Sequence, residues 1–374
     1  MPTPSKLSWT YVIAPNSYIL VTGATGFIGA HVVDTLLERG YKVRGSARSK
    51  PKADEMLNAR PQWKDRFDFI QVADFEGNTN LDDAVKDVDA VIHIASVRVP
   101  NEDGRTKNLF TFSNIQPFTY NTTNNEKELV LPAINGVKAL LNAASKNPNI
   151  QRIVLTSSFA AVVDIARTAG PDFTYTAAHW NPLTYAEAVD PATTAVVAYR
   201  GSKKFAELEA WAYVETHAPA FDLVTLCPPM VFGPVRHPGV ATPAALNESN
   251  AQLWSVTDKT APIPAVRVPL WIDVRDLARA HVEALLRDAA GGKRYTPVSP
   301  EPFSFGLAAR IVREGFPGRA RTPGAAPAED EALPGPSYGL DGATAARELG
   351  LEYRPFEQTV VDLVAQMEEL EGRQ

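Results

Sequence analysis

Cysteine is almost missing from the 374-residue chain, which holds Cys227 alone. A single cysteine excludes an internal disulfide and favours a reducing compartment, so we expect a cytoplasmic protein. The six histidines are scattered and show neither HxH nor HExxH spacing, so the sequence predicts no metal site. Uninterrupted apolar runs stay well below the ~20 residues that a membrane span needs, and residues 1–17 show no secretion signal, so no membrane association is expected.

Positive charge is also in short supply, because 37 basic residues face 43 acidic ones and the net charge is −6. Proteins that bind DNA or RNA non-specifically need a basic surface to displace counterions, so nucleic acid is not an expected partner. Hydrophobic residues make up 45% of the chain and charged residues 21%, as is usual for a globular protein. The length suits one large domain or two interleaved ones.

Strand and helix patterns alternate along the first two-thirds of the chain. The apolar run 18–21 predicts a buried strand, apolar residues from 28 to 37 recur at helical spacing until Gly40, and a second strand begins at 43. Further strands are expected at 67–72, 90–95, 152–156 and 222–227, and helices at 81–88, 126–146 and 199–216. This alternation predicts an α/β fold with a doubly wound parallel (Rossmann) sheet, which binds its ligand at the carboxyl ends of the strands.

The alternation breaks after Cys227, where proline and polar residues become frequent. Strand-then-helix patterning returns in "WIDVRDLARAHVEALLRD", residues 322–336 indicate a loop, and "FEQTVVDLVAQMEEL" predicts an amphipathic helix. We therefore expect a smaller C-terminal substrate lobe beside the nucleotide-binding Rossmann domain. The expected boundaries are 1–16 for an N-terminal arm, 17–234 with 271–290 for the Rossmann domain, and 235–270 with 291–355 for the lobe.

A glycine-rich turn joins the first strand to the first helix. Gly23, Gly26 and Gly29 follow one another at three-residue spacing in "GATGFIG". Such glycines permit a tight turn, let the backbone approach a pyrophosphate, and let the helix pack closely on the sheet. Because the trio lies between a strand and a helix, it predicts a dinucleotide site at the helix N-terminus.

A tyrosine and a lysine lie four residues apart in "AYRGSKK", at the start of a predicted helix. This spacing places Tyr199 and Lys203 on one helix face. Tyrosine is a poor acid–base group near neutral pH, and we expect the neighbouring ammonium to lower its pKa. Ser158, in "LTSSFAA", follows the fifth strand and is placed to bind a substrate oxygen. The three residues together predict a catalytic site.

These residues together resemble the extended branch of the short-chain dehydrogenase/reductase superfamily. The resemblance is closest to the NADPH-dependent carbonyl reductases related to dihydroflavonol reductase, which include the yeast and fungal aldehyde, ketone and methylglyoxal reductases. It covers nearly the whole chain and rests on the stretches "VTGATGFIGAHVV", "HIAS", "PAINGVKALLNAA", "RIVLTSS", "YRGSKKFAE", "PPMVFGP" and "WIDVRDLARAH".

The resemblance implies that NADP(H) is the cofactor and that Ser158, Tyr199 and Lys203 are the catalytic residues. In this family the tyrosine donates a proton to a carbonyl oxygen that the serine binds, and the lysine holds the nicotinamide ribose. Because the family uses the last serine of the pair, Ser157 is the weaker candidate. The cofactor contacts implied by position are Gly23, Thr25, Gly26, Phe27, Ile28, Asp74, Phe75, Ala95, Ser96, Tyr199, Lys203, Pro228 and Val231. Asp74 has the alternative interpretation of a helix N-cap.

Four basic residues in "VRGSARSKPK" stand out in an acidic chain. An enzyme that uses NAD places a carboxylate near this strand end for the ribose 2′-hydroxyl, and none occurs from 43 to 53. Arg48 can instead hold a 2′-phosphate with a bidentate fork, and Lys52 can add a point charge. The related reductases place an arginine and a lysine at the same spacing. We expect Lys50 to be solvated, and the direction of Arg44 stays open.

Several alternatives share this fold. Dehydratases carry an acidic pair after the active-site serine, where this chain has Phe159, Ala160 and Ala161. Sugar-nucleotide epimerases need a basic cluster in the substrate lobe, and none is evident. A hydroxysteroid dehydrogenase or isomerase stays open, as does a redox-sensing regulatory protein, although such proteins tend to lose the Tyr–Lys pair. One departure from the extended branch is Ala133, which stands where many members have asparagine.

The substrate pocket is the least legible part of the sequence. The aromatic-rich residues 108–120 follow the fourth strand, where the family places a substrate loop. Aromatic residues occur more often in a core than at a ligand, so core packing is the alternative for them. The candidate substrate contacts are Val97, Phe159, Met230 and Trp254. If they line the pocket, it is apolar and suits ketones or aldehydes with aryl or bulky groups. The small-molecule carbonyl would be the main partner, and the protein a monomer or a homodimer.

Overall fold

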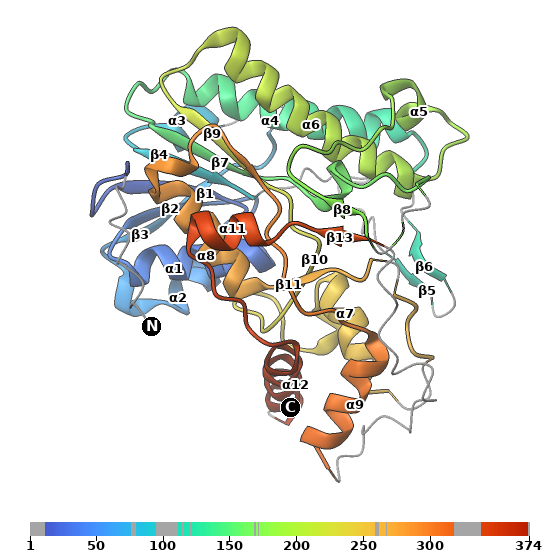
Figure 1. Cartoon of the computed structure of the whole chain (residues 1–374). Helices are drawn as coiled ribbons and strands as arrows, with labels where there is room; N and C mark the ends of the chain where they lie inside the picture. The colour runs from blue at the N-terminus through green and yellow to red at the C-terminus, as the bar shows by residue number, and fades with distance from the viewer. Residues whose placement is uncertain are drawn as a thin grey trace, which may run out of the picture.

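A seven-stranded parallel sheet forms the centre of the protein in the computed structural model (Figure 1). Every neighbouring pair of its strands is parallel. The strands, in spatial order, are β12 (Arg294–Tyr295), β9 (Asp222–Leu226), β7 (Arg152–Thr156), β4 (Ala90–His93), β1 (Tyr18–Thr22), β2 (Lys42–Ala47) and β3 (Phe67–Gln71). The structure describes residues 12–75, 80–94, 111–113, 116–119, 122–167, 170, 172–258, 262–266, 268–317 and 338–372.

The sheet order confirms the predicted doubly wound Rossmann fold. The chain runs outward from β1 through β2 to β3, then returns to the other side of β1 at β4. The carboxyl ends of β1 and β4 therefore flank the point where the strand order reverses, which is where such sheets bind ligands. The glycine turn follows β1, and the predicted catalytic serine follows β7, which neighbours β4.

Helices cover both faces of the sheet. Helix α1 (Phe27–Glu38) packs against α8 (Val274–Leu286) on one face, and α4 (Leu131–Ala144) packs against α6 (Ala195–His217) on the other. Successive residues of β1 serve the two faces, since Ile19 and Val21 join the first core and Leu20 joins the second. A strand buried on both faces needs apolar residues throughout, which explains the unbroken run in β1.

A second lobe lies below the sheet in Figure 1. Strands β10 (Met230–Phe232) and β11 (Trp271–Asp273) pair in parallel within it. Helices α7 (Glu248–Ser255), α9 (Phe305–Gly315) and α12 (Phe356–Gly372) complete it. Its core is rich in aromatic rings, which meet mostly edge to face.

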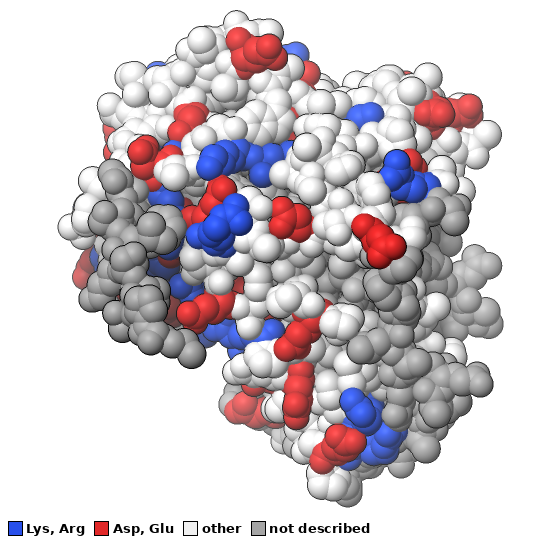
Figure 2. Space-filling view, viewed as in Figure 1, with Lys and Arg blue, Asp and Glu red and all other residues white. Residues whose placement is uncertain are grey.

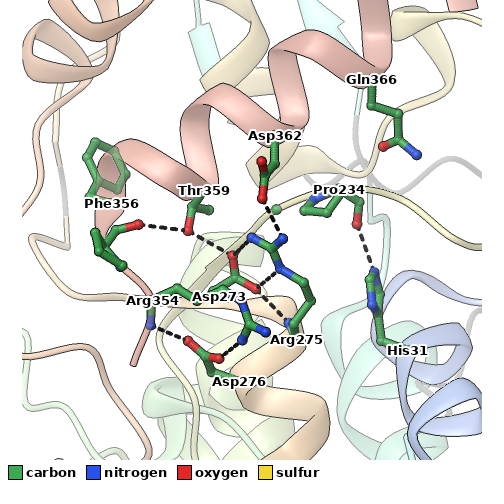
Figure 3. A network of polar contacts seen from close by, with 12 residues as sticks. His31, Pro234, Asp273, Arg275, Asp276, Arg354, Phe356, Thr359, Asp362 and Gln366 are labelled. Atoms are coloured by element: carbon green, nitrogen blue, oxygen red, sulfur yellow. Dashed lines mark hydrogen bonds and ion pairs between the residues drawn. The ribbon is translucent and has the colours of Figure 1, made fainter. Parts of the chain in front are cut away.

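The conspicuous stretch "WIDVRD" ties this lobe to the C-terminal helix (Figure 3). Asp273 caps α8 by accepting from the backbone N–H of Arg275 (2.7 Å), and it also accepts from the Thr359 hydroxyl on α12 (2.8 Å). Arg275 forms ion pairs with both Asp273 and Asp362, which also lies on α12. Asp273 is 1% exposed, so its charge needs compensation, which these donors provide. The paired side chains thereby hold α12 against the rest of the lobe.

The remaining elements are short. Helices lie at α2 (Lys50–Asn58), α3 (Leu81–Val85), α5 (Tyr185–Val189) and α11 (Ala343–Leu349), and strands at β5 (Thr111–Ser113), β6 (Gln116–Thr119), β8 (Thr174–Tyr175) and β13 (Gly339–Leu340). Single 3₁₀ turns occupy Pro61–Trp63, Phe159–Ala161, Pro243–Ala245 and Asp288–Ala290. Basic and acidic side chains are interspersed on the face shown in Figure 2. None of the helices that the structure describes is long and apolar enough to cross a membrane.

Some element boundaries differ from the sequence expectation. The helix expected at 126–146 begins with a π-helical turn, Glu126–Val130, before α4. Helix α6 begins at Ala195, where the Thr194 hydroxyl caps it, rather than at residue 199. Strand β12 belongs to the large sheet, although the sequence placed 291–355 in the lobe; two residues are too few to show a strand pattern. The expected loop 322–336 lies outside the described residues, and the other predicted domain boundaries stay predictions.

Candidate active site

The glycine-rich turn is a tight connection between β1 and α1. Gly23 has a φ of +68°, which favours glycine, and its carbonyl accepts from the backbone N–H of Gly26 (2.9 Å). A Cβ on Gly29 would overlap the Gly23 carbonyl, so a side chain there would force the helix away from the turn. Gly26 is the N-cap of α1, and no described side chain caps this helix end. The turn therefore presents backbone N–H groups and the positive end of the helix dipole, which fit a pyrophosphate.

The other predicted residues of this turn lie where the sequence expected. Thr25, Phe27 and Ile28 are all half-buried around the start of α1. Val231, from β10, is 9% exposed and belongs to a small apolar cluster against which Phe27 and Ile28 pack. Pro228 is buried, and its carbonyl accepts from the backbone N–H of Phe159 (2.9 Å).

Tyr199 and Lys203 lie on one face of α6, and the Lys203 Nζ is 5.5 Å from the centroid of the Tyr199 ring. The Ser158 hydroxyl, beyond the carboxyl end of β7, is hydrogen-bonded to the Tyr199 side chain. The structure thus brings together the three residues that the sequence selected. Tyr199 and Lys203 are half-buried by accessible surface, although protein atoms surround their polar groups densely enough to shift both pKa values.

The expected lowering of the Tyr199 pKa by Lys203 is wrong. Burial, followed by the negative charge of Glu248, raises the pKa of Tyr199 to about 12, and the hydrogen bond from Ser158 opposes this only in part. Burial also lowers the pKa of Lys203 to about 8. The reason is that desolvation, which penalises the charged form of each group, is the largest cause of both shifts. Tyr199 is therefore held as a neutral phenol, which is the form that can donate a proton.

The two serines after β7 have different partners. The Ser157 hydroxyl donates to Oε2 of Glu207 (2.6 Å) and points into the protein. The Ser158 hydroxyl accepts from the backbone N–H of Ala160 (3.1 Å) and bonds Tyr199. This geometry supports the choice of Ser158 as the reactive serine.

A buried carboxylate beneath the serines was missed by sequence reasoning. Glu207 is 1% exposed and forms an ion pair with Arg294 of β12 (2.7 Å). It also accepts from the hydroxyls of Thr225 (2.7 Å) and Ser157, and the Cys227 thiol lies 3.5 Å from its Oε2. Glu207 thereby joins α6 to three strands directly below Tyr199 and Lys203. The sequence signal was only an acidic residue four positions after Lys203, which usually indicates a solvated face.

His93 is a second residue that sequence reasoning did not select. It ends β4, its Nδ1 lies 2.7 Å from the Thr22 hydroxyl, and its ring meets Phe75 edge-on at 5.4 Å. Burial lowers the pKa of His93 to about 3, and the charge of Lys203 acts in the same direction. A neutral His93 therefore lies between the end of β1 and Lys203. The signal was a polar residue in the apolar strand "AVIHIA".

The basic stretch after β2 divides into separate roles. Arg48 and Lys52 are exposed and form no ion pair with a described residue. Lys50 pairs with Asp54 one turn along α2 (2.6 Å) and is solvated as expected. Arg44 is structural: it lies over the Tyr18 ring at 4.6 Å and donates to backbone carbonyls around the end of α3. Two cations thus remain available at the strand end, and residues 43–53 include no carboxylate that would oppose a phosphate.

Of the remaining predicted cofactor contacts, some lie within the described residues and some lie outside them. Asp74 is exposed, and it is not the N-cap of α3, a place that Asn80 takes. Phe75 is 9% exposed and packs on His93. Ala95, Ser96 and the substrate candidate Val97 lie outside the described residues.

The other substrate candidates lie in two different apolar clusters. Phe159 is 3% exposed and packs against Tyr175 and Tyr338 (5.8 and 5.9 Å). Trp254 is 8% exposed in the lobe core, and Met230 is half-buried beside that core. Core packing accounts for Phe159 and Trp254, while Met230 keeps the accessible surface that a substrate contact requires.

Comparison with known proteins places the chain in a family. The ketoreductase azaE of Aspergillus niger is 34% identical over 362 residues, covering 93% of this chain and 97% of the relative. The NADPH-dependent methylglyoxal reductase GRE2 of Saccharomyces cerevisiae is 32% identical over 369 residues, covering 95% and 99%. The solved structure of yeast methylglyoxal/isovaleraldehyde reductase Gre2 complexed with NADPH matches with a TM-score of 0.80 at 31% identity, covering 96% of this chain and 100% of that chain. Residues 19–296 match the NAD dependent epimerase/dehydratase family, and the chain belongs to that family.

Proposed function

We propose that the protein is an NADPH-dependent carbonyl reductase that converts a ketone or an aldehyde to an alcohol. The observation that carries this proposal is the hydrogen-bonded Ser158–Tyr199 pair with Lys203 beside it, at the carboxyl end of the central sheet. The relatives named for NADPH-dependent reduction and for ketoreductase activity support it, because each covers more than nine-tenths of this chain.

The residues around the cofactor site fit NADPH. The glycine turn would hold the pyrophosphate at the N-terminus of α1, Arg48 and Lys52 would hold the 2′-phosphate, and Lys203 would bind the nicotinamide ribose. Asp74 and Phe75 would flank the adenine, and Pro228 and Val231 the nicotinamide. When bound, NADPH supplies the hydride that the carbonyl carbon receives.

The side chains of this chain supply the proton and stabilise the developing charge. The Tyr199 phenol donates its proton to the carbonyl oxygen, and the Ser158 hydroxyl donates a hydrogen bond to the same oxygen. With a pKa near 12, Tyr199 keeps its proton at neutral pH until the oxygen becomes basic enough to take it. The charge of Lys203 then stabilises the phenolate that remains, which lowers the barrier for the transfer.

For the substrate we propose a carbonyl compound with an apolar or aryl group. Met230 is the described candidate with accessible surface, and residues 108–110, 114–115 and 120 of the aromatic-rich stretch 108–120 lie outside the described residues, so its role stays a prediction. NADPH oxidation across small polar, branched aliphatic and aryl carbonyls tests this class. Turnover of small polar carbonyls alone would contradict it.

The decisive experiment measures NADPH oxidation and alcohol formation over the same carbonyl panel for the wild type and Tyr199→Phe. We expect kcat to fall by about 10²–10⁴-fold in the variant, which loses its proton donor, with NADPH binding within about twofold of the wild type. Retained activity in Tyr199→Phe would overturn the mechanism. Conversion of a substrate without net NADPH oxidation would instead indicate an epimerase.

We also propose a cytoplasmic location and a monomeric or homodimeric state. The single cysteine, which is buried, suits a reducing compartment. Fluorescence microscopy of the tagged chain tests the location, and sedimentation velocity tests the assembly. A secreted protein or a stable tetramer would contradict these proposals.

A further inference from the structure

A segment that leaves the second lobe crosses to the helices that flank the proposed cofactor site. It follows β10 and comprises residues 233–239, and we call it the crossing segment. The backbone of Gly233 exchanges two hydrogen bonds with the Asn250 side chain, and the backbone of Val235 exchanges two with the Gln366 side chain (both 2.7 Å). The lobe therefore holds the beginning of the crossing segment firmly.

The Rossmann side holds the rest of the crossing segment. His31 of α1 donates from Nε2 to the Pro234 carbonyl (2.8 Å), as Figure 3 shows. Arg236 forms an ion pair with Asp34 of α1 (3.1 Å), and the backbone N–H of Gly239 donates to Glu55 of α2 (3.0 Å). The residues on either side of position 237 are thus held by α1 and α2, which places this position beside both helices.

The side chain at this point is a histidine with unused hydrogen-bonding capacity. The His237 ring meets the Phe27 ring edge-on at 6.0 Å, and Phe27 is the first residue of α1. Its Nδ1 is buried without a hydrogen-bond partner in the part of the chain that the structure describes. The ring as a whole is half-buried, so the edge that carries Nε2 stays accessible.

The accessible edge lies in the field of Lys52. Burial, and then the charge of Lys52, lowers the pKa of His237 to about 4, so the imidazole is neutral near pH 7. A neutral imidazole carries one proton, and because Nδ1 has no acceptor, the proton is better placed on Nε2. His237 thus offers an N–H donor within the electrostatic influence of Lys52, and a donor and a cation together suit an anionic oxygen.

We propose that His237 is a third ligand of the cofactor 2′-phosphate, beside Arg48 and Lys52. This inference rests on the proposed function, since it takes NADPH as the cofactor. His237 reaches the phosphate from the second lobe, whereas Arg48 and Lys52 follow β2 of the sheet. The phosphate would therefore bridge the two lobes, and the selectivity for NADPH would depend on the crossing segment as well as on the basic pair.

Binding of 2′,5′-ADP and of 5′-ADP, measured by calorimetry, tests the contact directly. His237→Phe keeps an aromatic ring against Phe27 and removes the donor, whereas His237→Gln restores an N–H. We expect His237→Phe to weaken 2′,5′-ADP by about 5- to 10-fold and to leave 5′-ADP within about twofold. His237→Gln should recover at least half of the loss on a logarithmic scale.

Other outcomes separate the possible errors. Equal weakening of both nucleotides would place His237 at the phosphate on the 5′ oxygen, which both share, or in a purely structural role, and unchanged binding would remove it from the site; each overturns the inference. A wild type that prefers 2′,5′-ADP while His237→Phe is unchanged leaves the proposed function standing. A wild type without that preference overturns NADPH selectivity and the inference together. If His237→Phe fails to fold, recognised by thermal unfolding, His237→Leu serves as the donor-free variant against His237→Gln.

Discussion

The two ends of the proposed cofactor site are built differently. At one end, Tyr199 and Lys203 are surrounded by protein, and Glu207 beneath them joins one helix to three strands. At the other end, Arg48 and Lys52 stand exposed after β2 and form no ion pair with described residues. The comparison indicates that the proposed catalytic residues depend on tertiary packing, whereas the side chains of Arg48 and Lys52, proposed for the 2′-phosphate, make few contacts with the rest of the fold.

The largest expected effect comes from breaking the buried end. Glu207→Gln removes the charge that compensates Arg294, whose side chain is 8% exposed, and should lower the free energy of unfolding by about 3–5 kcal/mol. Urea denaturation measures this. Glu209→Gln is the matched control on the same helix, because its pair with Lys138 is partly exposed, at 27% and 52% of the two side chains, and should contribute less than about 1 kcal/mol. Equal losses of unfolding free energy in the two variants would show that the buried pair of Glu207 with Arg294 is no more important for stability than a partly exposed pair.

A pH titration sharpens the same comparison. The pKa of Lys203 is about 8 in the folded chain, whereas an ordinary lysine, as in the unfolded chain, has a pKa of 10.5. As the pH rises, the folded chain therefore loses this proton at a lower pH than the unfolded chain does. Stability should therefore rise with pH between about 8 and 10.5, by about 3 kcal/mol from this group. Lys203→Met should lack that rise when the free energy of unfolding is measured across this range. Parallel curves for the two proteins would mean that Lys203 is not desolvated.

Substitutions at the exposed end should change cofactor binding and leave the stability of the protein unchanged. Arg48→Ala removes a charge-assisted contact to the 2′-phosphate and should weaken NADPH by about 10- to 100-fold, with NADH within about twofold. Fluorescence titration of both cofactors measures this, and the unfolding midpoint should not move. Lys50→Ala is the control, since Lys50 pairs with Asp54. A similar loss for both cofactors would contradict the assignment of Arg48.

The smallest expected effect separates the two serines. Ser157→Ala removes one donor to Glu207 and should cost about 1–2 kcal/mol of stability while kcat stays within about twofold. Ser158→Ala should do the reverse and lower kcat by about 10- to 100-fold with little change in stability. Loss of catalysis in Ser157→Ala alone would reverse the assignment.

The fold and the candidate site residues could be predicted from the sequence, because both predictions follow from local sequence patterns. Apolar runs separated by helical spacing predicted the parallel sheet, and the strand–turn–helix context of Gly23 and Gly26 predicted the turn. The edge strand at Arg294 was beyond reach, since two residues have no periodicity. The local patterns are therefore enough to predict a dinucleotide site at the glycine turn.

The pKa values and ion pairs of the candidate site could not be predicted from local sequence patterns. The pKa of Tyr199 depends on burial and on Glu248, which is distant in sequence and comes from the second lobe. Glu207 looked like a solvated helix residue until Arg294, from the edge strand, was seen to pair with it. A carboxylate is buried or solvated according to tertiary contacts, and those contacts leave no trace in the spacing of one helix.

The single cysteine gives the protein a built-in reporter. Cys227 is fully buried, and burial together with the charge of Glu207 raises the pKa of its thiol. The thiolate is the nucleophile that attacks alkylating reagents, so native Cys227 should react only when β9 and α6 separate. The labelling rate in the unmodified chain would therefore report how often the protein opens near the proposed catalytic serine, with no other thiol to obscure the signal.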